Sequence, residues 1–142
     1  MWRCIRYDWP LHFILVLTNV LPDNVIFLRL RGWLAHHFLG SCGRNLRLGR
    51  NVTLYNPSKI HLGHDIYVAI GTWFMAGADI TVEDEVLFGP YCVIVSSNHQ
   101  RRMGSFRFCG GDRRPITIGR GSWLAAHVTV TAGTIIGEGC LI

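Results

Sequence analysis

The chain has 142 residues, of which 49% are hydrophobic, and it carries a formal net charge of +5 at pH 7. This length suits one domain with at most a small appendage. The mean hydropathy of +0.26 is high for a soluble monomer, so we expect a buried oligomer face or a membrane contact. Nucleic acid is not an expected partner, because no recognition motif accompanies the basic residues.

The N-terminal segment, residues 1–44, lacks the repeat that marks the rest of the chain. Its apolar run at 11–21 is about half as long as the roughly 20 residues of a membrane-spanning helix. Residues 23–39 carry Arg29 and Arg31 between apolar side chains and predict an amphipathic helix. Two compatible interpretations stay open. The segment is a helical cap over the first strand edge, or it attaches the protein peripherally to the inner face of a membrane.

In residues 45–142 an apolar residue returns every six positions and is followed by a glycine or another small or polar residue. This period fits neither a helix nor a simple strand alternation, and a sandwich is disfavoured because its strands recur at about 8–12 residues. It predicts short strands, three to a coil, stacked as a parallel β-helix. The in-phase residues are Leu62, Val68, Phe74 and Ile80, then, after a two-residue slip, Val82, Phe88 and Ile94, and, after a gap, Ile118, Leu124, Val130, Ile136 and Ile142.

The position four residues after each in-phase residue is mostly small or branched, as a crowded corner requires. Cys92 and Cys140 occupy this position. The five cysteines are odd in number and form no C-x-x-C pair, which disfavours a disulfide framework. We therefore interpret these two cysteines as reduced packing residues and expect a cytoplasmic protein.

The repeat is interrupted once, between His99 and Pro115, and resumes at Ile116. Such an insertion predicts a loop extruded at about 99–115, and extruded loops commonly carry function. His99 stands at the root of this loop and is the best-placed titratable residue. Arginines in the loop suit an anionic ligand, although a solvated loop explains them equally well. They are Arg101, Arg102, Arg107, Arg113 and Arg114.

Two segments of the repeat carry a family resemblance. Residues 118–139 read IGRGSWLAAHVTVTAGTIIGEG, and residues 86–90, VLFGP, lead to Asn98 and His99. Together they resemble the hexapeptide-repeat O-acetyltransferases, in particular the maltose, galactoside, nodulation and capsule or lipopolysaccharide acetyltransferases. The resemblance covers residues 45–142. It implies a mainly β fold, a left-handed parallel β-helix of hexapeptide repeats with a short N-terminal helical segment.

The resemblance also implies a function, the acetyl-CoA-dependent transfer of an acetyl group to a hydroxyl of a saccharide or glycan precursor. A hydroxyl attacks a thioester well only as a base removes its proton, and an imidazole titrating near neutral pH does this. By resemblance His99 is this catalytic base, and the backbone N–H of Ala126 stabilises the oxyanion. The resemblance further assigns Trp123, Ala125 and Ala126 to cofactor binding, and Asn98 and Tyr91 to substrate binding.

The expected partners follow from the same resemblance. Family members are homotrimers with the active site between subunits, and a thin solenoid needs its apolar faces covered. The acceptor is a saccharide or a lipid-linked glycan, and acetyl-CoA is the co-substrate. No metal is expected, because no convergent ligand set is visible among His36, His37, His61 and His64.

Two features depart from the family pattern. Ala125 stands where the family prefers glycine. The chain stops at Ile142 in mid-coil, whereas these enzymes usually continue through a further coil and a tail that help to hold CoA, so the chain is apparently truncated at its C-terminus. The alternative function is therefore a non-catalytic or degenerate β-helix scaffold protein that lacks a complete CoA site.

Overall fold

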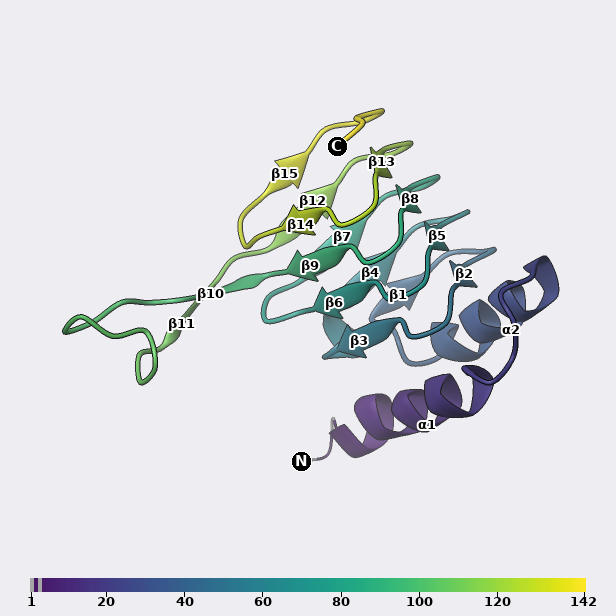
Figure 1. Cartoon of the computed structure of the whole chain (residues 1–142), viewed down its shortest axis with the longest axis horizontal. Helices are drawn as coiled ribbons and strands as arrows, with labels where there is room; N and C mark the ends of the chain where they lie inside the picture. The colour runs from purple at the N-terminus through teal and green to yellow at the C-terminus, as the bar shows by residue number, and fades with distance from the viewer. Residues whose placement is uncertain (1, 3) are drawn as a thin grey trace.

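Short parallel strands form three sheets around one core (Figure 1). The computed structural model describes residue 2 and residues 4–142. The chain visits the three sheets in a fixed order, so that each circuit makes one coil of a solenoid. The first sheet contains β1 (Ser41–Cys42), β4 (Ile60–Leu62), β7 (Ile80–Val82), β12 (Ile116–Ile118) and β15 (Ile135–Ile136); the second contains β2 (Arg47–Leu48), β5 (Tyr67–Val68), β8 (Leu87–Phe88) and β13 (Trp123–Leu124); the third contains β3 (Thr53–Tyr55), β6 (Trp73–Met75), β9 (Val93–Val95) and β14 (Thr129–Val130).

Equivalent residues of successive coils pair with one another. Phe88 pairs with Val68, 20 positions earlier, and Ile136 pairs with Ile118, 18 positions earlier. The earlier coil is therefore two residues longer than the last one, and this extra length accounts for the two-residue slip in the repeat. Leu124 pairs with Phe88 across 36 positions, because the inserted loop lies between them. The loop lengthens one coil without changing which residues stack.

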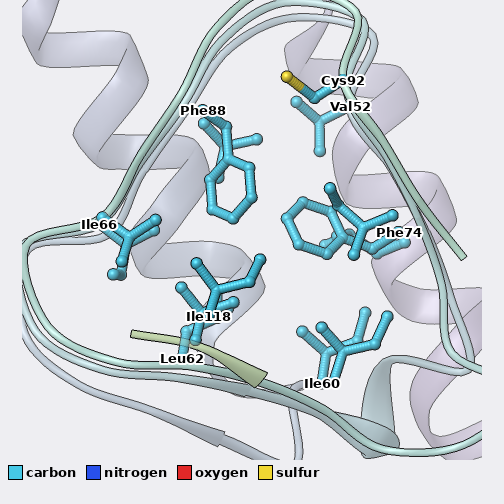
Figure 2. Close-up of a cluster of buried hydrophobic side chains, with 14 of the residues drawn as sticks. Val52, Ile60, Leu62, Ile66, Phe74, Phe88, Cys92 and Ile118 are labelled. Atoms are coloured by element: carbon cyan, nitrogen blue, oxygen red, sulfur yellow. The ribbon is translucent and has the colours of Figure 1, made fainter. Parts of the chain in front are cut away.

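The core is a continuous column of aliphatic and aromatic side chains inside the coils (Figure 2). All the in-phase residues except Ile142 are buried. Phe74 and Phe88 meet edge to face, with ring centroids 5.1 Å apart. The fold class predicted from the six-residue period, a mainly β parallel helix of hexapeptide repeats with an N-terminal helical segment, is confirmed.

The cysteines take part in this packing as thiols. All five are free, and Cys92 is fully buried inside a corner, as its place in the repeat predicts. Cys140 packs against the edge of the core. Burial raises the pKa of the Cys42 thiol to about 11 and also raises the pKa of Cys92. Both groups are therefore protonated at neutral pH and are poor nucleophiles.

A residue in the left-handed region turns the chain in every coil at two of the three corners, and Asn56 and Gly133 adopt this conformation at the third corner. Between the second and third sheets the turn positions are Asn51, Gly71, Tyr91 and His127, and between the first and second sheets they are Asn45, Asp65, Glu85, Gly121 and Gly139. Asparagine, aspartate and glycine are the usual residues for this conformation. Tyr91 is a bulky exception, and backbone strain of this kind gathers at functional sites.

Two helices close the end of the solenoid at its first coil (Figure 1). α1 (Trp9–Thr18) follows a π-helical turn, η1 (Cys4–Asp8), and a 3-10 turn, η2 (Pro57–Lys59), precedes β4. α2 (Val25–His36) begins after Asn24, whose side chain accepts a hydrogen bond from the N–H of Phe27 at 3.1 Å. Among the described residues, none of the helices combines the length and apolarity needed to cross a membrane.

Arg31 departs from the polar helix face predicted for residues 23–39, because its side chain is fully buried. Its guanidinium donates to the Asp23 carboxylate at 2.7 Å and to the carbonyl of Leu48 in β2 at 2.9 Å. It also donates to the carbonyls of Thr18 at 3.3 Å and Leu21 at 2.7 Å, at the end of α1 and in the turn after it. One side chain therefore joins both helices to the first coil.

Replacing Arg31 tests this role. Arg31→Met keeps much of the side-chain volume but removes the guanidinium that pairs with Asp23 and donates to the Leu21 and Leu48 carbonyls, so we expect the free energy of unfolding to fall by about 3 kcal/mol or more. Urea denaturation followed by circular dichroism measures the change. The control is Arg29→Met on the same helix, an exposed position where the change should stay within about 0.5 kcal/mol. Equal effects of the two substitutions would contradict the assigned role.

Candidate active site

His99 lies on a hairpin that leaves the solenoid. Beyond β9, the chain continues into β10 (Ser97–His99), which pairs antiparallel with β11 (Gly111–Arg113) and projects from the third corner (Figure 1). We call residues 97–113 the His99 hairpin. His99 is exposed, and its partner across the hairpin is Gly111, so no side chain stands opposite the imidazole. The ring is therefore open to an incoming group.

Ser96 anchors the root of this hairpin. Its hydroxyl is buried, donates to the carbonyl of Ala78 at 2.7 Å and accepts from the N–H of the same residue at 3.0 Å. Its carbonyl accepts from the N–H of Arg114, at the far root of the hairpin, at 3.2 Å. These bonds hold both roots against the preceding coil. The backbone that leads to His99, three residues further on, is therefore held in place at the root of the hairpin.

Ala126 lies at the turn between the second and third sheets, which we call the Ala126 corner (residues 125–127). Its N–H makes no hydrogen bond to any described residue, and the residue is exposed. Gly89 of the coil below makes room for this backbone, since a Cβ there would lie 2.7 Å from Ala125 C and Ala126 N. A free N–H held by a rigid coil is the kind of donor that an oxyanion requires.

Tyr91 and His127 form a stack at the same corner. Their rings lie 5.4 Å apart at an interplanar angle of 11°. Tyr91 lies over Gly71, where a Cβ would meet the Tyr91 ring at 2.4 Å. The N–H of His127 donates to the carbonyl of Pro90 at 2.9 Å, which joins the two coils. The stack forms an aromatic wall beside the Ala126 N–H.

Trp123 and Ala125 complete this corner. Trp123 is 49% exposed on the outer face of the second sheet, next to Leu87 of the coil below and Leu141 of the following turn. The N–H of Ala125 donates to the carbonyl of Ile142 at 2.9 Å, and its own carbonyl accepts from the Cys92 thiol at 3.0 Å. Tyr91, Ala125 and Ala126 therefore lie at one corner, and Trp123 lies on the strand that leads into it.

The chain does not bring His99 and Asn98 to these residues. The run from Tyr91 to Ser97 is one side of a coil, and at about 3.3 Å per extended residue it spans roughly 20 Å. Asn98 stays with His99 on the hairpin, opposite Asp112. The two residues assigned to substrate binding, Asn98 and Tyr91, thus lie at different corners. One copy of the chain holds the two halves of the predicted site apart.

Other groups contribute little to either half. The arginines of the His99 hairpin are exposed, and Arg114 pairs with Asp112 at 2.8 Å. A cavity of 780 Å³ lies between α1 and strands β3 and β6, and its lining includes no residue of the hairpin or of the Ala126 corner. Within residues 2 and 4–142, no group of three or more His, Cys, Asp or Glu side chains is arranged to hold a metal ion.

The fold is a three-sided solenoid of six-residue repeats, and a hairpin projects from one of its corners. This is the fold of the hexapeptide-repeat acetyltransferases. An enzyme of this class from Vibrio cholerae, solved with acetyl-CoA, matches with a TM-score of 0.77 over 93% of this chain and 70% of that chain, at 20% identity. A galactoside acetyltransferase solved with coenzyme A matches with a TM-score of 0.74 over 91% of this chain and 66% of that chain, at 24% identity.

Curated sequence relatives of the chain are acetyltransferases as well. The galactoside O-acetyltransferase of Escherichia coli K12 is 26% identical over 115 residues, which cover 77% of this chain and 54% of that protein. The chain spans about half the length of the curated relatives it matches. No protein-family model matches it. The resemblance seen in the sequence is nevertheless confirmed by both kinds of relative.

Sequence reasoning missed three residues that shape the site. Ser96 precedes the interruption of the repeat, and a small polar residue at an inward position was a usable signal. Gly89 follows the in-phase residue Phe88, but several other glycines also follow an in-phase residue, so the sequence offered no reason to single it out. His127 occupies a turn with positive φ, and its stacking on Tyr91 follows from the coil register, which the local sequence does not reveal.

Gly89→Ala tests the close packing beneath the Ala126 corner. The added methyl must displace the Ala125 and Ala126 backbone, so we expect a lower melting temperature and at least about tenfold weaker CoA binding. Calorimetry and differential scanning fluorimetry measure the two effects. Gly110→Ala is the control, since its nearest contact would be Gln100 at 3.8 Å. If Gly89→Ala leaves both quantities unchanged, the packing argument is wrong.

Proposed function

We propose that the protein transfers the acetyl group of acetyl-CoA to a hydroxyl of a saccharide. The observation that carries this proposal is the unpaired N–H of the exposed residue Ala126 in a fold that two CoA-bound acetyltransferase structures share, with His99 on the hairpin that leaves the solenoid. The saccharide acceptor draws support from the galactoside-specific name of one relative. Lipid-linked glycans belong to the same acceptor class.

The two halves of the site would perform complementary steps. His99 takes the proton from the acceptor hydroxyl while the oxygen bonds to the thioester carbonyl carbon. The Ala126 N–H donates a hydrogen bond to the oxyanion that forms there. When the carbon–sulfur bond breaks, the His99 imidazolium returns its proton to the leaving thiolate. Trp123 and Ala125 would flank the bound cofactor, and Asn98 and Tyr91 the acceptor.

We further propose a homotrimer in which the His99 hairpin of one subunit meets the Ala126 corner of the next. The separation of the two halves by roughly 20 Å within one chain supports this arrangement. A threefold axis repeats one heterologous contact and closes the ring. Each subunit therefore contributes its His99 hairpin to one site and its Ala126 corner to another. Exposed aromatic residues on the solenoid sides, Tyr55, Trp73 and Trp123, offer apolar area for such contacts. The free thiols support a cytoplasmic location.

Two substitutions separate the proposed roles. His99→Ala should lower kcat by about 10²–10⁴ while CoA binding persists. Ala126→Pro removes one N–H without breaking an internal hydrogen bond, and Pro90 already occupies the equivalent position one coil below. We expect it to keep the fold and lower kcat by about 10²–10³. Turnover is measured as CoA release with a panel of mono- and disaccharide acceptors.

The controls make the outcomes distinct. His37→Ala changes an exposed histidine of the helical end and should leave turnover unchanged. Turnover that survives His99→Ala would contradict the assignment of the base alone. If the wild-type chain binds no acetyl-CoA in millimolar titrations, the enzyme proposal is wrong and the protein is a scaffold.

Mixed trimers test the shared site. Chains carrying His99→Ala and chains carrying Ala126→Pro, co-expressed with different tags and purified through both, should regain about a third of the wild-type turnover, because one of the three contacts in each mixed trimer then joins two intact halves. Light scattering coupled to gel filtration checks the trimer mass. Trimers without recovered turnover would show that both halves must come from the same chain.

A further inference from the structure

The two helices at the end of the solenoid are apolar on both sides. In α2 the buried positions are Leu28, Arg31, Gly32 and Ala35, so Ile26, Leu30 and Trp33 lie on the opposite, outward side, with 73%, 36% and 64% exposed surface. In α1 and the turn after it the exposed apolar residues are Trp9, Phe13, Val16, Leu17 and Val20, all at least half exposed, and the first three of them border the cavity between α1 and strands β3 and β6. We call this exposed apolar surface of α1 and α2 the base.

Positive charge surrounds the base. Arg6 lies before α1, and Arg29 lies on the flank of α2, where it lines a cavity of 490 Å³ together with Trp33, Arg44 and His64. None of these three arginines forms an ion pair with a described residue. The nearby carboxylate of Asp23 is already paired with Arg31 at 2.7 Å and with Arg50 at 3.7 Å. α1 and α2 themselves contain no acidic residue, and the carboxylate of Asp8 stands directly before α1.

The base is also held in a fixed shape. The buried guanidinium of Arg31 ties both helices to β2, and Asn19 at the end of α1 accepts from the N–H of Asn51 at 2.9 Å. A surface that is already ordered loses little conformational entropy when it binds. The apolar side chains are therefore presented together, at the end opposite the last coil (Figure 1).

We propose that the base docks on an anionic lipid bilayer. Tryptophan and phenylalanine over a helix pair, with unpaired arginines at the rim, match the composition that seats helices at the headgroup level. A second copy fits less well, because two bases placed face to face would bring their unpaired arginines together. The proposal stands without the acetyltransferase assignment. In the proposed trimer, which uses the solenoid sides, three bases would remain free to bind together.

Vesicle co-sedimentation of the full chain tests the proposal. The vesicles contain phosphatidylcholine alone or mixed with phosphatidylglycerol, and we expect binding to the mixed vesicles that weakens with salt. Phe13→Glu combined with Trp33→Glu should reduce partitioning by about tenfold or more. The matched control is Phe106→Glu combined with Phe108→Glu on the His99 hairpin, where both phenylalanines are at least half exposed.

A second pair of variants tests the charges. Arg29→Glu with Arg44→Glu should lose about tenfold or more in partitioning, whereas Arg101→Glu with Arg102→Glu makes the same change in net charge away from the base. Equal losses in both pairs, or no vesicle binding by the wild type, would overturn the proposal. So would a fall in oligomer mass for Phe13→Glu with Trp33→Glu, since the base would then be an interface between copies. CoA binding by these variants reports separately on the proposed function.

Discussion

The in-register stacking of coils is the constraint on which the rest of the structure depends. Each strand has only two or three residues, and the hydrogen bonds that satisfy its backbone come from the coils before and after it. Phe88 must therefore lie over Val68 and under Leu124, whatever the chain does between these residues. This fixed register allows a hairpin to be inserted at one corner while a backbone donor is presented undisturbed at another.

Much of the solenoid could be predicted because inward residues carry a chemical signature. The period placed Leu62, Phe74 and Ile118 in the core, and its one gap located the hairpin. The turn conformations were less predictable. Asn51 and Gly71 favour a positive φ by their chemistry, but Tyr91 adopts it because it stands in the same column. Position in the stack overrides residue preference there.

The helical end shows a different limit of sequence reasoning. Helical periodicity assumes that charged side chains face water, so Arg31 was grouped with Arg29 although the two point in opposite directions. The hydrogen bonds that compensate Arg31 come from backbone carbonyls far along the chain, such as that of Leu48, and no pattern around α2 reveals them. Once Arg31 is buried, the apolar residues on the opposite side are left exposed. The burial of one charge thus accompanies the exposure of the base.

The candidate site was predicted residue by residue, but its geometry was not. The sequence assigns Asn98, His99 and Trp123 to one site but does not show at which corner of the coil each residue lies. The three-sheet circuit instead sends the hairpin out between the third and first sheets, while Trp123 precedes the corner between the second and third. Because rigid coils hold these corners apart, no loop movement short of unstacking a coil can join them. The proposed function therefore needs a second surface to complete the site, and the homotrimer that we propose supplies it from another copy of the same chain.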